Sequence, residues 1–178
     1  MTQEPAIAAA RGIRLAVFDV DGVLTDGRLY YGGDGSEYKA FHVRDGLGIK
    51  LLQRAGIQVA IITGRNSPSV SRRAAELGID HLLQGREDKL DALRELLAAH
   101  FRTGAEDLSA VAYMGDDLPD LPAICAVGLG MTVADACPAV LARARWCSVR
   151  PGGAGAAREA AEFILRARQR FDLLQEAP

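Results

Sequence analysis

The chain has 178 residues, of which 49% are hydrophobic and 25% are charged, a composition typical of one globular domain with a substantial core. A net charge of −2 and scattered basic residues provide no surface for nucleic acid. The segment 1–12 lacks the basic start and the long apolar run of a signal peptide or a membrane span. We therefore expect a cytoplasmic protein without a nucleic-acid or membrane partner.

Short apolar runs alternate with segments of helical periodicity, which predicts an α/β fold in a single domain over 1–178. We expect a Rossmann-like three-layer sandwich with a mainly parallel sheet. The strands are predicted at about 14–19, 57–62, 80–83, 109–114, 126–130 and 145–149. Cys125, Cys137 and Cys147 are too widely spaced for a zinc motif or a disulfide framework, so we expect buried free thiols.

The first predicted strand carries two carboxylates to one edge of the sheet. Side chains alternate along a strand, so Asp19 and Asp21 point the same way. Two like charges this close call for a cation, and a divalent metal ion is the simplest one. Gly22 lets the backbone turn sharply just after them. Taken alone, the pattern also fits an acidic turn without chemistry.

The segment at about 28–41 predicts a β-hairpin with a glycine-rich turn, inserted after the first strand. It carries three tyrosines and one phenylalanine, Tyr30, Tyr31, Tyr38 and Phe41. A two-stranded ribbon is marginal in water, so we expect these side chains to pack on another surface. That surface is either another subunit or the hairpin's own domain.

Helical segments follow the hairpin and the later strands. Asp45 is the expected N-cap of a helix that ends at Gly56, and Ser67 opens another that ends at Gly78. Leucines at helical spacing predict a helix at about 87–101 that contains Lys89, and the C-terminal helix and tail are expected at about 155–178.

Polar residues also follow two later strands. Thr63, Gly64 and Arg65 offer a hydroxyl, an amide and a guanidinium just before a helix, which suits an anion such as phosphate. Asp116 follows the strand at 109–114 and could complete an oxygen-ligand site for Mg²⁺. Lys89 is placed where a cation could face the same edge. Singly, these residues also fit ordinary structural roles.

Together, the ordered set resembles the haloacid dehalogenase superfamily of phosphotransferases. The motifs of that superfamily are D-x-D, a Ser or Thr after a second strand, a Lys, and an acidic G-D-D-x-x-D segment, and all four are present in order. The resemblance implies that Asp19 is the nucleophile that forms an aspartyl phosphate, and that Asp21 protonates the leaving alkoxide and then activates water. Thr63 and Lys89 would hold the phosphoryl oxygens.

The resemblance also implies a cofactor. Mg²⁺ would be held by the Asp19 carboxylate, the Asp21 backbone carbonyl and Asp116, with waters completing its shell. Asp120 would support this shell or cap a helix.

The spacing between the motifs narrows the resemblance to a subgroup without a cap domain. The segments between them, 22–62 and 64–88, are too short to hold such a domain. The motifs resemble the tetrameric phosphatases that act on 3-deoxy-D-manno-octulosonate 8-phosphate in lipopolysaccharide sugar synthesis. The resemblance runs from about 14 to about 168 and rests on 19–27, 41–46, 61–65, 84–89, 115–118, 133–136 and 152–159. It implies a homotetramer that acts on a small sugar acid phosphate. Two departures are His42, where Asn is common, and Ala154, where a larger polar or basic residue often occurs.

A 2-keto sugar acid carries a carboxylate away from the reacting phosphate, and an arginine is its natural partner. The arginines that could bind the substrate are Arg44, Arg65 and Arg158. Gly64 is a further candidate for substrate binding, through its backbone amide.

Four other functions fit parts of the pattern. One is a phosphatase for another 2-keto sugar acid, such as a nine-carbon ulosonate 9-phosphate. A second is a receiver-like phospho-Asp switch, although receivers place their acidic pair and the phosphorylated Asp on different strands, whereas Asp19 and Asp21 share one. The others are a partner protein without turnover and a phosphatase of macromolecules, which no basic or peptide-binding stripe supports.

Overall fold

The computed structural model describes residues 4–100, 107–170 and 172, and its centre is a six-stranded parallel sheet. The sheet order is β5-β4-β1-β6-β7-β8. These strands span His81–Leu83, Gln58–Ile62, Leu15–Phe18, Val111–Met114, Leu129–Thr132 and Trp146–Cys147, in that order. Side chains on both faces of β1, β6 and β7 are buried, which explains their unbroken apolar runs.

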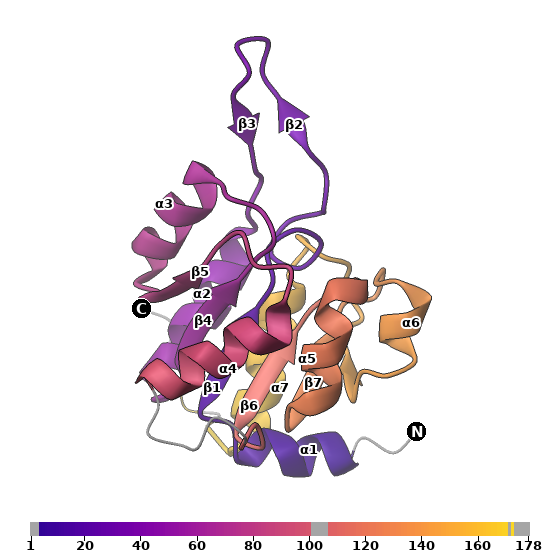
Figure 1. Cartoon of the computed structure of the whole chain (residues 1–178). Helices are drawn as coiled ribbons and strands as arrows, with labels where there is room; N and C mark the ends of the chain where they lie inside the picture. The colour runs from indigo at the N-terminus through magenta and orange to yellow at the C-terminus, as the bar shows by residue number, and fades with distance from the viewer. Residues whose placement is uncertain (1–3, 101–106, 171, 173–178) are drawn as a thin grey trace.

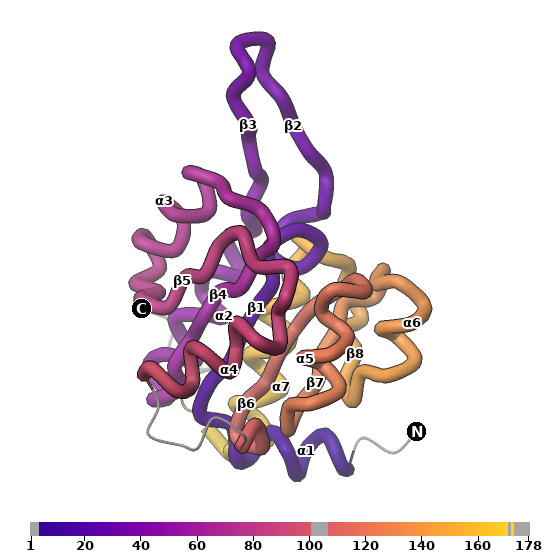
Figure 2. Tube along the Cα trace, viewed as in Figure 1, coloured from indigo at the N-terminus to yellow at the C-terminus, as the bar shows by residue number. Residues whose placement is uncertain are grey.

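Two layers of helices cover the sheet (Figure 1). One layer contains α1 (Glu4–Arg11), α2 (Val43–Arg54), α3 (Pro68–Leu77) and α7 (Ala156–Ala167). The other contains α4 (Lys89–His100), α5 (Leu121–Ala126), which follows the short 3₁₀ turn η1 (Leu118–Asp120), and α6 (Pro138–Leu141). The α/β sandwich and the mainly parallel sheet are confirmed. Figure 2 shows β6, β7 and β8 running side by side.

The hairpin forms as predicted and stands apart from the body (Figure 1). Its strands β2 (Tyr30–Tyr31) and β3 (Glu37–Tyr38) form a separate two-stranded antiparallel sheet. Tyr31 and Tyr38 are 64% and 59% exposed, so these rings are not packed on their own domain. The hairpin leaves the body at the end where the parallel strands have their carboxyl termini.

Some local predictions are wrong. The N-cap of α2 is His42, whose Nδ1 accepts a hydrogen bond from Arg44 N, and not Asp45. Asp45 is instead buried in the first turn and accepts from Arg158 N, so it caps α7 across the helix interface.

The thiols are free, but Cys125 and Cys147 are exposed and Cys137 is partly exposed, not buried. Helices α1, α5 and α6 were not predicted, because they have eight, six and four residues, too few for a periodic pattern. Residues 171 and 173–178 of the expected tail, and residue 101 of the helix predicted at about 87–101, lie outside the described residues.

Candidate active site

The site lies at the carboxyl ends of β1, β4 and β6, where three motifs meet. Asp19 follows β1 directly, and its N–H donates to Met114 O at the end of β6. At Gly22 the chain takes a φ of +93°, and a Cβ there would overlap the Asp116 carboxylate. Glycine is therefore required at this turn both for its conformation and for the close approach of Asp116.

Lys89 joins two of these strand ends from the first turn of α4. Its Nζ lies 2.7 Å from Asp19 Oδ1 and donates a second hydrogen bond of 3.0 Å to Ile62 O, at the end of β4. Asp120 Oδ1 lies 3.3 Å from the same ammonium. All three charged side chains are buried, so their interactions are little screened by water.

Three carboxylates gather around this lysine. Oxygens of Asp19, Asp116 and Asp120 all lie within 4.8 Å of one another. Asp120 uses both oxygens inside the protein: Oδ1 accepts from Tyr113 OH at 2.8 Å, and Oδ2 accepts from the N–H groups of Asp116 and Asp117. Asp120 thus supports the cluster and caps η1, one of the roles expected for it. Asp116 Oδ1, by contrast, is buried without a hydrogen-bond partner among the described residues.

The carboxylates outnumber the positive charges near them. Burial, together with the charge of Asp120, raises the pKa of the Asp19 carboxyl to about 7, although Lys89 opposes this effect. Burial and the charges of Asp120 and Asp19 raise the pKa of Asp116 to about 7 as well. Burial alone would lower the pKa of Lys89, but Asp19 and Asp120 hold it above its ordinary value. The cluster holds more negative than positive charge, and one oxygen of Asp116 has no partner among the described residues. A small divalent cation that prefers oxygen ligands, such as Mg²⁺, therefore fits it.

Asp21 is not part of this cluster, and the prediction that it shares a strand with Asp19 is wrong, because β1 ends at Phe18 and Asp21 lies in the turn that follows. Its Oδ1 forms an ion pair with Lys39 Nζ and lies 3.5 Å from Thr25 Oγ1. Its Oδ2 is buried and has no hydrogen-bond partner among the described residues. The structure therefore brings Asp19 and Asp116 into one cluster, while the described contacts of the Asp21 carboxylate are with Lys39 and Thr25.

The predicted phosphate-binding segment lies at the end of β4. Thr63 is buried, and its N–H donates to Leu83 O. Gly64 is partly exposed, and Arg65 turns toward the hairpin. Arg65 Nη2 lies 2.5 Å from Glu37 Oε2 and 3.5 Å from Tyr31 OH.

Two predicted arginines lie elsewhere. Arg44 and Arg158 line a cavity of about 330 Å³ between the starts of α2 and α7, and Arg158 Nε is paired with Glu162 at 2.7 Å. No described contact joins either guanidinium to the aspartate cluster. This arrangement does not bring them together with Asp19 within one subunit.

A glycine-rich loop before α7 supports the turn that carries the aspartates. Gly153 N donates to Val23 O at 3.0 Å. A Cβ on Gly152 would overlap Gly22 O. The two backbones are therefore in direct contact, and the loop fixes the position of the turn.

Sequence reasoning missed Lys39, Glu37 and Tyr113 as parts of the site. One signal was available for Lys39, because the chain has 18 arginines but only three lysines, at positions 39, 50 and 89. Two of the three lysines pair with the two aspartates of the D-x-D motif.

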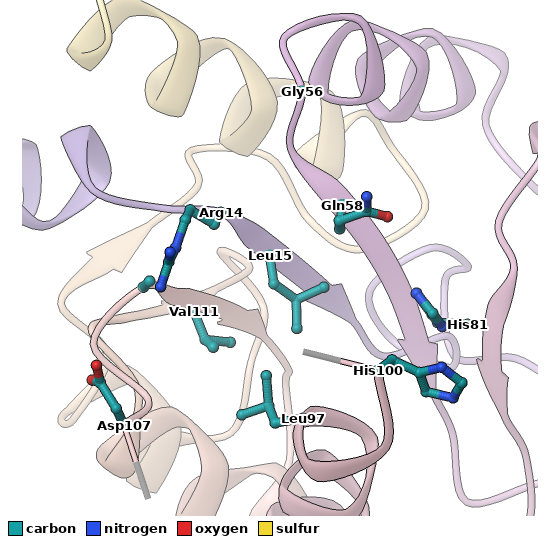
Figure 3. A pocket seen from close by; sticks show the side chains of 10 residues that line it. Arg14, Leu15, Gly56, Gln58, His81, Leu97, His100, Asp107 and Val111 are labelled. Atoms are coloured by element: carbon teal, nitrogen blue, oxygen red, sulfur yellow. The ribbon is translucent and has the colours of Figure 1, made fainter. Parts of the chain in front are cut away.

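A cavity of about 620 Å³ lies at the opposite edge of the sheet (Figure 3). Arg14, Gln58 and Asp107 are on its rim, and Leu15 and Val111 come from the amino ends of their strands. None of Asp19, Asp116 and Asp120 lines it, so its size does not make it the reaction site. Within the described ranges, no helix is long and apolar enough to cross a membrane.

The chain is similar to enzymes with a stated activity over nearly its whole length. It is 47% identical over 169 residues to the 3-deoxy-D-manno-octulosonate 8-phosphate phosphatase KdsC of Yersinia pestis, covering 95% of the chain and 88% of the relative. With KdsC of Escherichia coli K12 it shares 48% identity over 166 residues, or 93% of the chain and 86% of the relative. No protein-family model matches the chain.

A solved structure is similar throughout the fold. The 3-deoxy-D-manno-octulosonate 8-phosphate phosphatase from Moraxella catarrhalis, in complex with a magnesium ion, a phosphate ion and a KDO molecule, superposes with a TM-score of 0.92. It is 45% identical and covers 98% of this chain and 97% of its own.

Proposed function

The chain belongs to the 3-deoxy-D-manno-octulosonate 8-phosphate phosphatases of the haloacid dehalogenase superfamily, and we propose that it hydrolyses this sugar acid phosphate to 3-deoxy-D-manno-octulosonate and phosphate. It is a Mg²⁺-dependent phosphoric monoester hydrolase of lipopolysaccharide sugar biosynthesis. The observation that carries the proposal is the pairing of Asp19 with Lys89 beside the unpartnered oxygen of Asp116.

The first chemical step is phosphoryl transfer to Asp19. An oxygen of its carboxylate forms a bond to phosphorus while the ester P–O bond breaks, and the proton carried by Asp21 goes to the departing sugar oxygen. Lys89, 2.7 Å from the nucleophile, holds its carboxylate in place and balances the charge that spreads over the phosphoryl oxygens. Thr63 binds one of these oxygens.

The second step returns the enzyme to its starting state. Asp21, now a carboxylate, takes a proton from a water molecule whose oxygen bonds to phosphorus, and the bond between Asp19 and phosphorus breaks. Asp21 is thereby protonated again for the next cycle. Its unpartnered Oδ2 is the oxygen free to carry this proton.

In this proposal Asp19, the Asp21 backbone carbonyl and Asp116 would hold Mg²⁺. When bound, the ion neutralises charge so that a carboxylate anion can approach a phosphate anion. Asp120 keeps Asp116 oriented through its hydrogen bond to the backbone N–H of that residue.

Recognition of the sugar acid uses groups near the hairpin. Within one subunit, Gly64 and Arg65 bind the substrate, because they follow Thr63 directly. The cavity that Arg44 and Arg158 line does not include Asp19. These two arginines would therefore bind the substrate carboxylate only if they reach the site of a neighbouring subunit. We propose one cytoplasmic, capless domain over 1–178 that assembles as a homotetramer through its hairpins, with the exposed tyrosines as the supporting observation.

The test is Mg²⁺-dependent phosphate release from 3-deoxy-D-manno-octulosonate 8-phosphate, a nine-carbon ulosonate 9-phosphate and a panel of common sugar phosphates. Asp19→Asn is the control, and it should retain the fold and less than a few per cent of the activity. Preference for the eight-carbon substrate is the expected result. Preference for the nine-carbon substrate would keep the mechanism and reassign the substrate, whereas no release from any of them would reject the proposal.

A further inference from the structure

Lys39 connects the hairpin to the proposed acid and base of the reaction. It follows β3, and its side chain is only 1% exposed, although Tyr31 and Tyr38 on the same hairpin are largely exposed. Its Nζ pairs with Asp21 Oδ1. Burying a lysine side chain is costly unless its charge is paired, so this contact anchors the returning end of the hairpin to the D-x-D turn.

The ion pair does not stand alone. Lys39 Nζ also lies 3.6 Å from Glu37 Oε1, and the other oxygen of Glu37 is 2.5 Å from Arg65 Nη2. The hydrogen bond from Arg65 is the main cause that lowers the pKa of Glu37, so this carboxylate stays ionised. Asp21, Lys39, Glu37 and Arg65 therefore alternate in charge from the D-x-D turn, through the hairpin, to the loop after β4.

The two oxygens of Asp21 are in different situations. Oδ1 is held by Lys39 and by Thr25, whereas Oδ2 is buried and has no partner among the described residues. A carboxylate held by one oxygen cannot rotate freely, and its second oxygen keeps a fixed direction. An acid or base in catalysis requires this kind of fixed direction.

We propose that Lys39 is a positioning residue: it holds Oδ1 of Asp21 so that Oδ2 faces the oxygen that leaves phosphorus and, later, the attacking water. Glu37 and Arg65 hold Lys39 in turn. This inference rests on the proposed function, because it assigns a support to the acid and base of that reaction. The proton moves only between Asp21 Oδ2 and the substrate or water oxygen, and Lys39 keeps its charge throughout.

Lys39→Met removes the charge and keeps most of the length of the side chain. The matched control is Arg28→Met, which removes a cation just before β2, the other strand of the hairpin. Arg28 is exposed, and its Nη1 lies 3.7 Å from Asp26 Oδ2. Lys39→Arg tests rescue, since it restores a cation. Circular dichroism, thermal unfolding and sedimentation velocity on all variants separate a loss of fold or assembly from a loss of positioning.

The decisive comparison is between leaving groups. A sugar alkoxide needs a proton to leave, whereas 4-nitrophenolate does not, so the first turnover with 4-nitrophenyl phosphate bypasses the acid. For Lys39→Met we expect kcat on the sugar acid phosphate to fall by about 100-fold or more with KM changed less than about threefold. The first-turnover release of 4-nitrophenolate should stay within about threefold of wild type, followed by slow turnover because the base is also misplaced. Arg28→Met should behave like wild type, and Lys39→Arg should recover part of kcat.

Other outcomes would overturn the inference. An equal loss on both substrates in a folded Lys39→Met variant would mean that Lys39 serves the nucleophile or phosphate binding. Unchanged kcat on the sugar acid phosphate would mean that the ion pair has no role in catalysis. Both results are distinct from failure of the proposed function, in which the wild-type enzyme itself would release no phosphate from the sugar acid phosphate.

Discussion

Lys89 donates a hydrogen bond of 2.7 Å to Asp19 from a position 70 residues further along the chain. Both side chains are buried, and the same ammonium is shared with Asp120. One lysine therefore sets the position of the proposed nucleophile and also offsets the charges that would otherwise repel one another.

Replacing Lys89 by Met should reduce both stability and activity. Two buried carboxylates would lose their cation, and the free energy of unfolding at pH 8 should fall by about 3 kcal/mol. Phosphate release should fall below a few per cent of wild type, because the transferring phosphoryl group loses its positive partner. Urea unfolding and a phosphate assay measure the two effects. Arg94→Met, which breaks an exposed ion pair on the same helix, should cost less than about 1 kcal/mol, and a similar cost for Lys89→Met would contradict the prediction.

The pKa values of Asp19 and Asp116 predict how stability depends on pH without metal. Each carboxyl keeps its proton to about pH 7 in the folded chain, against an ordinary value of 3.8. Between these pH values the folded chain binds more protons than the unfolded chain does, so these two groups lower the free energy of unfolding as pH rises from about 4 to about 7. In EDTA, Asp116→Asn should therefore stabilise the protein at pH 8 and have little effect at pH 5.

Mg²⁺ should reverse this loss. The ion binds the ionised carboxylates, and protons compete with it at low pH. We expect excess Mg²⁺ to raise the melting temperature by about 5 °C at pH 8 and by much less at pH 5. Thermal unfolding at both pH values, with and without Mg²⁺, measures this difference. Asp116→Asn should abolish the shift, and a shift of equal size in that variant would place the ion elsewhere.

Asp19, Asp116 and the sheet could be predicted from sequence because each of these aspartates follows a strand, and Lys89 because it opens a helix with a leucine periodicity. Parallel strands bring their carboxyl ends to one edge, so Asp19 and Asp116 meet whatever the details of the loops. The helix from Ser67 to Gly78 was predictable for a similar reason, since Gly78 adopts the left-handed conformation that ends helices.

What sequence could not predict depends on contacts between distant segments. Asp45 satisfies the local pattern of an N-cap, yet His42 takes that place and Asp45 caps α7, 113 residues away. The pairing of Lys39 with Asp21 depends on the direction in which the hairpin leaves the body, and no periodicity encodes that direction. The same holds for Gly152, whose contact with Gly22 O joins two loops.

Gly152→Ala should disturb the site from a distance. The added Cβ would overlap Gly22 O and come within 3.0 Å of Thr25 O, and both are backbone atoms that cannot rotate away. We expect a loss of about 1–3 kcal/mol in the free energy of unfolding and a lower kcat, because the turn after Asp21 must shift. Gly33→Ala is the control, since no atom lies within 4 Å of its added Cβ. Equal stability of the two variants, from chemical denaturation, would show that the glycine loop does not support the turn.

The exposed tyrosines of the hairpin predict that assembly can be weakened without harming the metal site. Tyr31→Ser with Tyr38→Ser removes two large rings that solvent reaches in the single chain, and sedimentation velocity should show a shift toward smaller species. The double variant should keep its Mg²⁺-dependent thermal shift, since Asp19 and Asp116 belong to the body. Activity on the sugar acid phosphate should fall, because a capless site then stays open to water. Leu141→Ser, on α6, removes another exposed apolar side chain and should leave the sedimentation profile unchanged. If the double variant sediments like wild type, the hairpin is not the contact between subunits, and its tyrosines serve some other purpose.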